Sequence, residues 1–332
     1  MAGRVIRAPG WKVRGWDVCE PPHSVAQEFG GTGDFRLTEH DLELLGDLLK
    51  HRFLVSRQVR QYKGQRSANR RLKRLLDEGL VARAIIPRPA LFSEGDRATW
   101  EYVYGLTEFG FSCLVANEDH LAERLQGDWK APYRRAGLKD TITHQVELAD
   151  LCNGIEAYTS GADLSVSWRG RDLERIQIPG SGFGERWVTI YPDAALHFST
   201  GDTLYVEHQR WIDADKINDH LEDYSVMFAR KPWGQFGREP QVLMAVSDLT
   251  NPKQNRVKDV MGQVLDLTRR FYTLFGHLWL IRESNWRAGN WLVEPADPQK
   301  KPTDLYEITV KKYLAGPAER VGVVRREADE EA

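Results

Sequence analysis

Hydrophobic residues in the first third of the chain recur at helical spacing and are followed by two stretches typical of strands. Between residues 38 and 79 the apolar positions repeat every three or four residues in three successive segments, which predicts three helices. Residues 81–86 and 99–106 have the composition of strands and flank a loop that contains Pro and Gly. Three helices followed by a β-hairpin predict a winged helix-turn-helix, to which we assign residues 35–116.

The predicted helices carry end signals. Thr38-x-x-Asp41 is a capping-box pattern at the start of the first helix. Ser56 is expected to cap a short second helix, because a serine hydroxyl accepts hydrogen bonds from the backbone of a first turn. The third helix is predicted over residues 67–78, with Gly79 taking the left-handed conformation just after its end.

A second series of elements begins at residue 141. Its order of helix, three strands, helix and strand is typical of an α/β domain, which we assign to residues 141–312, so that the whole chain combines α+β and α/β parts. Residues 117–140 are polar and predict a linker, residues 1–34 a flexible basic arm, and residues 313–332 a charged tail. The predicted elements are a helix at 141–158, a strand at 164–168, a hairpin around 199–201, a helix at 213–228, a strand at 241–246, a helix at 257–275 and a strand at 277–282.

The hairpin is defined by alternation of apolar and polar residues. Ser199-Thr200-Gly201 suits a three-residue loop in which the glycine takes the left-handed position. Such a loop pairs Ala194 with Val206 and Leu196 with Leu204, which makes one face of the hairpin consistently apolar.

The same register places two carboxylates side by side on the other face. Asp193 lies directly across from Glu207, and Gln209 follows two residues later. Like charges at this separation repel and seldom pair across a sheet without a compensating cation. A divalent metal ion would supply that charge, and so would Arg210 or Lys216 in a metal-free hairpin, so the sequence leaves both alternatives open.

The pattern Pro-Asp followed by Glu-x-Gln on the next strand resembles the core of the PD-(D/E)XK nuclease superfamily. The resemblance implies that Asp193 and Glu207 bind Mg²⁺ and that a following lysine helps to activate water. Gln209 occupies the usual lysine position, which is a departure, and Lys216 near the start of the next helix is the candidate for a displaced lysine. The superfamily often places an acid on its first helix, which implies a role for Glu147; the alternative is a surface glutamate.

Positive charge is concentrated in one segment. The chain of 332 residues has a formal net charge of −2, yet residues 52–88 contain eleven Lys or Arg and two acidic residues, a local charge of +9 that leaves −11 elsewhere. Such a block is the electrostatic footprint of a nucleic-acid contact. Cationic side chains opposite the apolar stripe of the third helix can reach phosphates and guanine edges in a major groove. The candidate DNA-contacting residues are Arg57, Arg66, Asn69, Arg70, Lys73, Arg74, Arg83 and Arg88.

Composition and motifs exclude several other classes of protein. No run of 18 apolar residues is present, so no membrane partner is expected, and the basic N-terminus lacks the apolar core of a secretory signal. Cys19, Cys113 and Cys152 lie far apart, which predicts neither a zinc site nor a disulfide framework and fits a reducing cytoplasm. The two-histidine motif of relaxases, the Walker A motif and the nucleophile elbow are also missing from the sequence.

Four short motifs together resemble the replication-relaxation family, whose members occur on bacterial mobile elements. They are Thr-x-His-x-x-Glu-Leu from Thr141, Pro-Asp-Ala from Pro192, Val-Glu-His-Gln-Arg from Val206, and Lys followed eight residues later by Tyr from Lys216. The resemblance extends over residues 37–224 and implies a part in plasmid replication or DNA transfer. The family usually has Glu-x-Asp-Arg on the acidic strand, so Gln209 removes a third acid.

Three functions follow from these patterns. The first is a sequence-directed, double-stranded DNA-binding protein of a mobile element, located in the cytoplasm with the nucleoid or a plasmid, and acting as a homodimer or with other replication or transfer proteins. The second is an active Mg²⁺-dependent endonuclease. The third is an adaptor that uses its winged helix against a protein partner, in which case the charged helix face is merely solvated.

Overall fold

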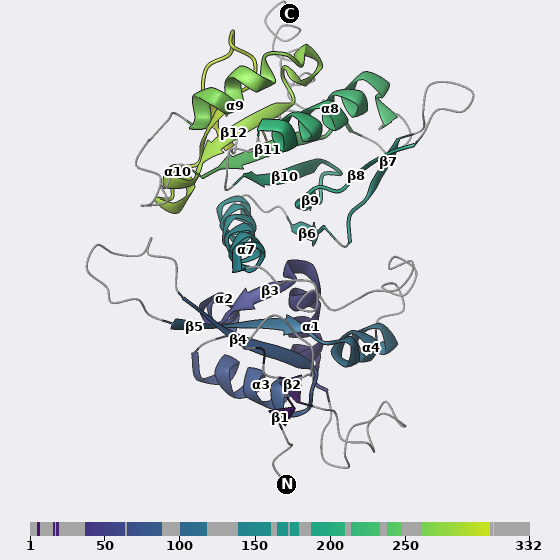
Figure 1. Ribbon diagram of the computed structural model, residues 1–332, viewed down its shortest axis with the longest axis vertical. Helices are drawn as coiled ribbons and strands as arrows, with labels where there is room; N and C mark the ends of the chain where they lie inside the picture. Colours follow the sequence, from purple (N-terminus) through teal and green to yellow (C-terminus); the bar gives the residue numbers. More distant parts are fainter. Residues whose placement is uncertain are drawn as a thin grey trace, which may run out of the picture. The chain divides into compact units, whose positions relative to one another are not determined.

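The computed structural model is a mixed α and β structure that divides into two compact units, residues 1–150 and 151–332 (Figure 1). The division falls inside helix α7, Lys139–Ser160. The structure describes residues 5–6, 16, 18–19, 37–63, 65–87, 100–117, 139–160, 165–171, 173–178, 187–209, 214–232, 238–247, 260–305 and 308. Most of the predicted linker and all of the predicted tail lie outside these ranges.

The first unit contains the three predicted helices and both predicted strands. The two-residue strands at residues 5–6 and 18–19, the strand β3 and the helix α4 were not predicted. Strand β3 is only three residues long, too short to show a period. The strands form an antiparallel sheet in the order β3-β5-β4, and residues 5–6 pair with residues 18–19 as β1 and β2. The elements are α1 Glu39–His51, β3 Phe53–Val55, α2 Ser56–Lys63, α3 Gln65–Asp77, β4 Val81–Pro87, β5 Trp100–Leu106 and α4 Glu108–Asn117.

The helix ends of this unit follow two of the three predicted signals. Thr38 caps α1, and the reciprocal hydrogen bonds with Asp41 complete the capping box. Gly79 has a φ of 73°, the left-handed conformation that ends α3. The prediction for Ser56 is wrong, because Ser56 is the first helical residue and the side chain of Gln58 accepts a 2.8 Å hydrogen bond from the N–H of Val55.

One face of the three-stranded sheet is covered by residues distant in the sequence. Ile142 and Val146 from α7 pack there against Phe53 and Val55. Trp16 is buried in the same cluster, with its ring 5.6 Å from that of Phe53. Residues 1–34 were predicted to form a flexible or loosely docked basic arm, and Trp16 is a docked residue within that segment.

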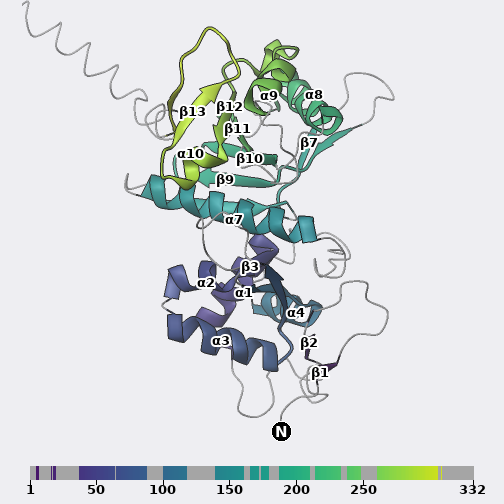
Figure 2. The same ribbon diagram turned by 60° about the vertical axis from the view of Figure 1, so that its left-hand side comes forward.

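The second unit is built on a seven-stranded mixed sheet in the order β14-β13-β12-β11-β10-β9-β6. Figure 2 labels the five strands from β13 to β9. Strands β6, β9 and β10 are antiparallel neighbours, and β10, β11 and β12 run parallel. A separate antiparallel pair is formed by β7 and β8. The elements are β6 Val166–Gly170, β7 Ile176–Ile178, β8 Val188–Ile190, β9 Ala194–Phe198, β10 Thr203–Gln209, α8 Ala214–Arg230, β11 Gln241–Val246, α9 Val260–Thr268, η3 Tyr272–Leu274, β12 Leu278–Arg282, α10 Glu283–Arg287, β13 Leu292–Pro295 and β14 Thr303–Asp304.

Helix packing completes this unit. The apolar stripe of α8, which includes Leu221 and Met227, joins Val242 and Met244 of β11 in one core. The predicted helix at 257–275 is interrupted, since α9 ends at Thr268 and only a short 3₁₀ turn, η3, follows. No helix in the described ranges is long and apolar enough to span a bilayer.

Candidate carboxylate site and nucleic-acid interface

The β9–β10 hairpin brings Asp193 and Glu207 together. Gly201 has a φ of 86°, and the pairs Ala194–Val206 and Leu196–Leu204 are formed, so the predicted loop and register are confirmed. Asp193 directly precedes β9, and its Oδ2 accepts a 3.0 Å hydrogen bond from the N–H of His208. The carboxylates are 5% and 1% exposed respectively, so they interact with little screening by water.

Side chains from α8 and from the turn after β6 surround the two acids. The hydroxyl of Tyr224 donates a 2.8 Å hydrogen bond to Glu207 Oε1. Nδ1 of His220 lies 3.4 Å from Glu207 Oε2, within ion-pair range but without a well-formed hydrogen bond. Arg171 Nη1 is 3.6 Å from Asp193 Oδ1. The structure therefore supplies a histidine and an arginine as charge partners.

The electrostatics of the cluster centre on Glu207. Burial raises the pKa of Glu207 above its ordinary value, and the charge of Asp193 raises it further, while His220 and Tyr224 act in the opposite direction. The Glu207 carboxylate raises the pKa of His220, against the effect of burial. Burial and then the Glu207 charge hold the pKa of Tyr224 well above its usual range. This arrangement favours any additional positive charge next to the acids.

Arg171 and His220 were not among the cations that we expected next to the acids. Lys216 is exposed in the first turn of α8, and Arg210 lies outside the described residues. His220 was missed, although Lys216, His220 and Tyr224 are spaced four residues apart and so share one helix face. Arg171 follows β6 and carries no sequence signal, because only the folding of the sheet brings it near Asp193.

Two further predicted site residues have defined environments. Gln209 is the half-buried last residue of β10. Glu147 is only 3% exposed, so the alternative of a surface glutamate is wrong. Its helix carries buried residues on several sides, which hides the position of a core-facing acid from a periodicity argument. Among the described residues, no three or more His, Cys, Asp or Glu side chains form a group arranged to hold a metal ion.

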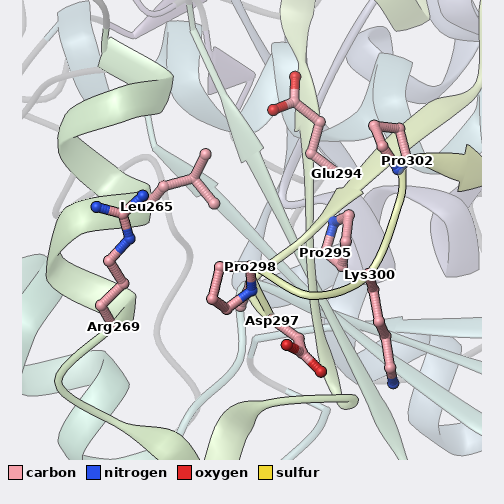
Figure 3. A pocket seen from close by; sticks show the side chains of 9 residues that line it. Leu265, Arg269, Glu294, Pro295, Asp297, Pro298, Lys300 and Pro302 are labelled. Atoms are coloured by element: carbon pink, nitrogen blue, oxygen red, sulfur yellow. The ribbon is translucent and has the colours of Figure 1, made fainter.

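Two cavities of the second unit lie apart from the carboxylates. The first, of about 130 Å³, is lined by Leu265 of α9, by Arg269 just after that helix, and by residues 294–298, 300 and 302 (Figure 3). It is smaller than the ~300–1,000 Å³ typical of ligand sites. The second, of about 510 Å³, adjoins β7 and the turn of the β9–β10 hairpin. Two of the acids that line it are already paired, Asp202 with Arg238 at 3.0 Å and Glu174 with both Arg169 and His197.

Helix α3 has the two-sided character that was predicted for it. Ala68, Leu72, Leu75 and Leu76 are buried. The exposed side chains of its described residues are Ser67, Asn69, Arg70, Lys73, Arg74 and Asp77. Lys73 forms a 2.8 Å ion pair with Asp77, but both groups are well exposed, so the pair is weak and open to exchange. The side chains of Arg66 and Arg88 lie outside the described part of the chain, and their roles remain predictions.

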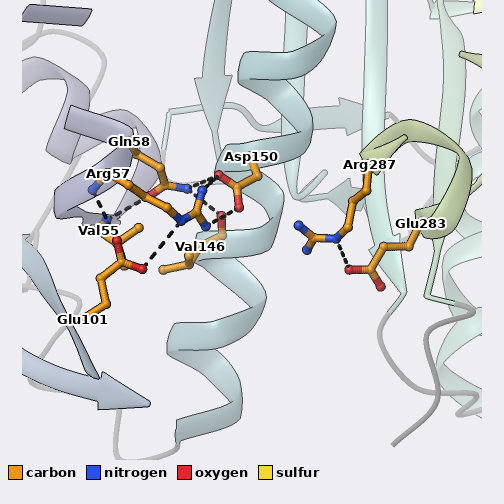
Figure 4. Close-up of polar contacts among 8 residues, drawn as sticks. All are labelled: Val55, Arg57, Gln58, Glu101, Val146, Asp150, Glu283 and Arg287. Carbon is orange, nitrogen blue, oxygen red and sulfur yellow. Dashed lines mark hydrogen bonds and ion pairs between the residues drawn. The ribbon is translucent and has the colours of Figure 1, made fainter. Parts of the chain in front are cut away.

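Arg57 is engaged within its own unit (Figure 4). Its guanidinium donates hydrogen bonds of 2.6 and 2.5 Å to the two carboxylate oxygens of Asp150 and lies 3.5 Å from Glu101. Arg83 is half-buried and stacks over the ring of Tyr102 at 4.7 Å. Because the carboxylates hold the Arg57 donors, we leave Arg57 out of the DNA-contacting set.

Comparison with known protein families concerns both the carboxylate site and helix α3. A family model described as replication-relaxation matches residues 45–235. The match begins within α1 and ends beyond α8, so it includes α3 and the carboxylate pair. No curated protein and no solved structure matches the chain.

Proposed function

The chain belongs to the replication-relaxation family, and from that premise we propose that it is a sequence-directed, double-stranded DNA-binding protein of a mobile element. The observation that carries the proposal is the exposed polar face of α3, on which Asn69, Arg70, Lys73 and Arg74 lie opposite a buried apolar stripe. A helix with this distribution can enter a major groove, where arginine and lysine read guanine and bind phosphates.

The order of elements in the first unit supports a winged helix-turn-helix. Helices α1, α2 and α3 precede the β4–β5 hairpin in the chain. Strand β3 pairs with the edge of β5 that does not pair with β4. In this arrangement α3 is the recognition helix and the β4–β5 hairpin is the wing. Arg83 on β4 and Arg88 beyond it are then candidates for contacts to the flanking backbone.

The second unit supports a nuclease-like core. Apart from the separate β7–β8 pair, which lies between β6 and β9 in the chain, the elements α7, β6, β9, β10, α8 and β11 follow the αβββαβ order. Three of the strands are antiparallel neighbours, and the fourth is parallel to the third. We propose that this unit provides a further DNA contact, a protein contact or a dimer interface. Its carboxylates are compensated by Arg171 and His220, which favours binding over catalysis as the first proposal.

An active Mg²⁺-dependent endonuclease is the second candidate, favoured by the buried pair of Asp193 and Glu207. Carboxylate oxygens are the ligands that Mg²⁺ takes, and it commonly uses one or two of them together with water. Asp193 and Glu207 would hold the ion, which when bound lowers the pKa of water and stabilises phosphoryl charge. Gln209 or Lys216 would orient the attacking water, and Glu147 would assist.

One gel experiment separates the candidates. Purified protein is incubated with labelled duplex DNA in EDTA, Mg²⁺ or Mn²⁺, next to the Asp193→Asn variant. A mobility shift in EDTA with intact DNA in every lane supports the binding protein. Cleavage that requires metal and is lost in Asp193→Asn, with the shift retained, supports the endonuclease. Neither a shift nor cleavage, across probes from the element's own DNA, favours a protein adaptor.

A further inference from the structure

The antiparallel pair β7–β8, hereafter the β7–β8 ribbon, has one buried and one exposed face. The pairs Ile176–Ile190 and Ile178–Val188 turn inward and contact the core that contains α8. Figure 1 shows the two strands of the ribbon next to α8. The side chains between them alternate to the outside, as the period of two in a strand requires. The ribbon is therefore anchored by its inner face, while its outer face is available to a partner.

The outer face carries two large aromatic side chains. Trp187 is 59% exposed and Tyr191 is 44% exposed, whereas Trp279, Trp286 and Trp291 of the same unit are buried. Trp187 and Tyr191 lie about 13 Å apart along the strand, at roughly 3.3 Å per residue. The small side chain of Thr189 stands between them and leaves room for planar groups.

Positive charge accompanies these rings. Continuing the register by one residue places Arg175 opposite Tyr191, and Arg175 is exposed and joins none of the ion pairs formed by the described residues. Gln177, the partner of Thr189, is also exposed. Tyr191 is two residues before Asp193, and the exposed Arg171 reaches that carboxylate. The strip of aromatic and basic residues thus leads to the carboxylate site.

We propose that the outer face of the β7–β8 ribbon binds single-stranded DNA, with Trp187 and Tyr191 stacking on bases and Arg175 on a phosphate. The inference rests on the proposed DNA-binding function and adds a second type of DNA to it. Single strands offer unstacked bases to aromatic side chains, whereas a duplex keeps its bases covered. A protein partner would need further apolar surface, but the described neighbours of the two rings on this face are polar or charged.

The test uses the full chain and fluorescence anisotropy with labelled oligothymidylate of about 15 nucleotides, a length within the usual site range. The double variant Trp187→Ala/Tyr191→Ala should bind oligothymidylate ten-fold or more weakly. Each stack of an aromatic ring on a base commonly contributes about ten-fold to the affinity. Trp187→Phe/Tyr191→Phe should retain most of it. Tyr272→Ala is the matched control, because Tyr272 is a 78% exposed aromatic residue on η3.

The outcomes separate this inference from the proposed function. An unchanged oligothymidylate affinity in the double alanine variant, or no binding by the unaltered protein, overturns the inference even if duplex binding persists. A change in sedimentation of that variant without a change in affinity assigns the face to a second copy of the chain and also overturns it. A third outcome overturns only the proposal that α3 is the recognition helix. In that outcome Arg70→Ala/Lys73→Ala leaves the affinity for duplex DNA unchanged, while Trp187→Ala/Tyr191→Ala still loses the binding of oligothymidylate.

Discussion

Glu207 is a carboxylate whose ionised form is opposed both by burial and by a neighbouring acid. Its pKa is raised in the folded state, so between the unfolded and folded values the folded protein binds more protons than the unfolded chain. Stability therefore falls as the pH rises through that window. Proteins commonly keep such unfavourable arrangements at functional sites, which is a reason to regard the hairpin as more than a structural element.

Replacing Asp193 should remove part of the destabilisation that the ionised Glu207 causes. Asp193→Asn removes the adjacent charge but keeps an oxygen that can accept from the N–H of His208. We expect the free energy of unfolding at pH 8 to increase by about 1 kcal/mol, and the gain to shrink toward pH 4.5 as Glu207 becomes protonated. Thermal melts across this pH range measure it.

Asp202→Asn is the control for that substitution. Asp202 is also a buried acid of the hairpin, but it is paired with Arg238 at 3.0 Å, so its replacement should destabilise the protein at neutral pH. Equal effects of the two substitutions would contradict the repulsion between Asp193 and Glu207.

Arg57 is expected to act on stability rather than on DNA. Arg57→Ala would leave the half-buried Asp150 without its bidentate partner, at a cost of about 2–3 kcal/mol. Urea denaturation should show this loss, and Arg57→Lys should restore only part of it because lysine cannot form the two parallel hydrogen bonds. Duplex affinity of the folded variant should match that of the unaltered protein. A selective loss of affinity without destabilisation would return Arg57 to the DNA-contacting set.

At the level of elements, α3 is the part of the chain whose charge should be measurable in solution. Arg70→Ala/Lys73→Ala should weaken duplex binding and lower the slope of log affinity against log salt by about 0.9 for each phosphate contact removed. Anisotropy titrations at several salt concentrations give both quantities. Lys301→Ala removes an exposed cation of the second unit and is the control. Equal slopes for the double variant and the control would exclude α3 as the DNA-binding helix.

Replacing each of two helical glycines by alanine should change the stability of the protein in opposite directions. A Cβ on Gly154 of α7 would lie 2.9 Å from the ring of Trp291, whereas a Cβ on Gly46 of α1 would meet nothing within 4 Å. Gly154→Ala should therefore destabilise the protein by roughly 1–3 kcal/mol through overpacking. Gly46→Ala should stabilise it by up to about 1 kcal/mol, since alanine is the better helix former. Urea denaturation of both variants tests the pair, and a stabilising Gly154→Ala would contradict the contact with Trp291.

At the level of the whole molecule, the sequence was most informative where the signal is local. The hairpin register followed from alternation and one glycine, the start of α1 from its capping box, and the end of α3 from Gly79. The approach of Arg171 and His220 to the acids could not be predicted, because it depends on strand order and on the seating of α8 against β10. The short β3 was missed for a similar reason, since it is stabilised by pairing with the distant β5. The break after α9 was missed because the helical prediction was continued through residues 269–275, where the chain forms turns and a short 3₁₀ helix.

Divalent metal provides a test that reports on the whole molecule without requiring cleavage. If Asp193 and Glu207 bind Mg²⁺ or Mn²⁺, the ion must compete with Arg171 and His220 for the carboxylates, yet it would relieve the repulsion between them. Binding to the folded state alone would add about 2.7 kcal/mol of stability at a hundred-fold excess over Kd. We expect the melting temperature to rise with Mn²⁺ in the unaltered protein and to stay constant in Asp193→Asn and Glu207→Gln.

A rise of the same size in all three proteins would place the ion elsewhere. No rise in any of them would mean that the arginine and the histidine already complete the site, and would leave DNA binding without metal chemistry as the function of this hairpin.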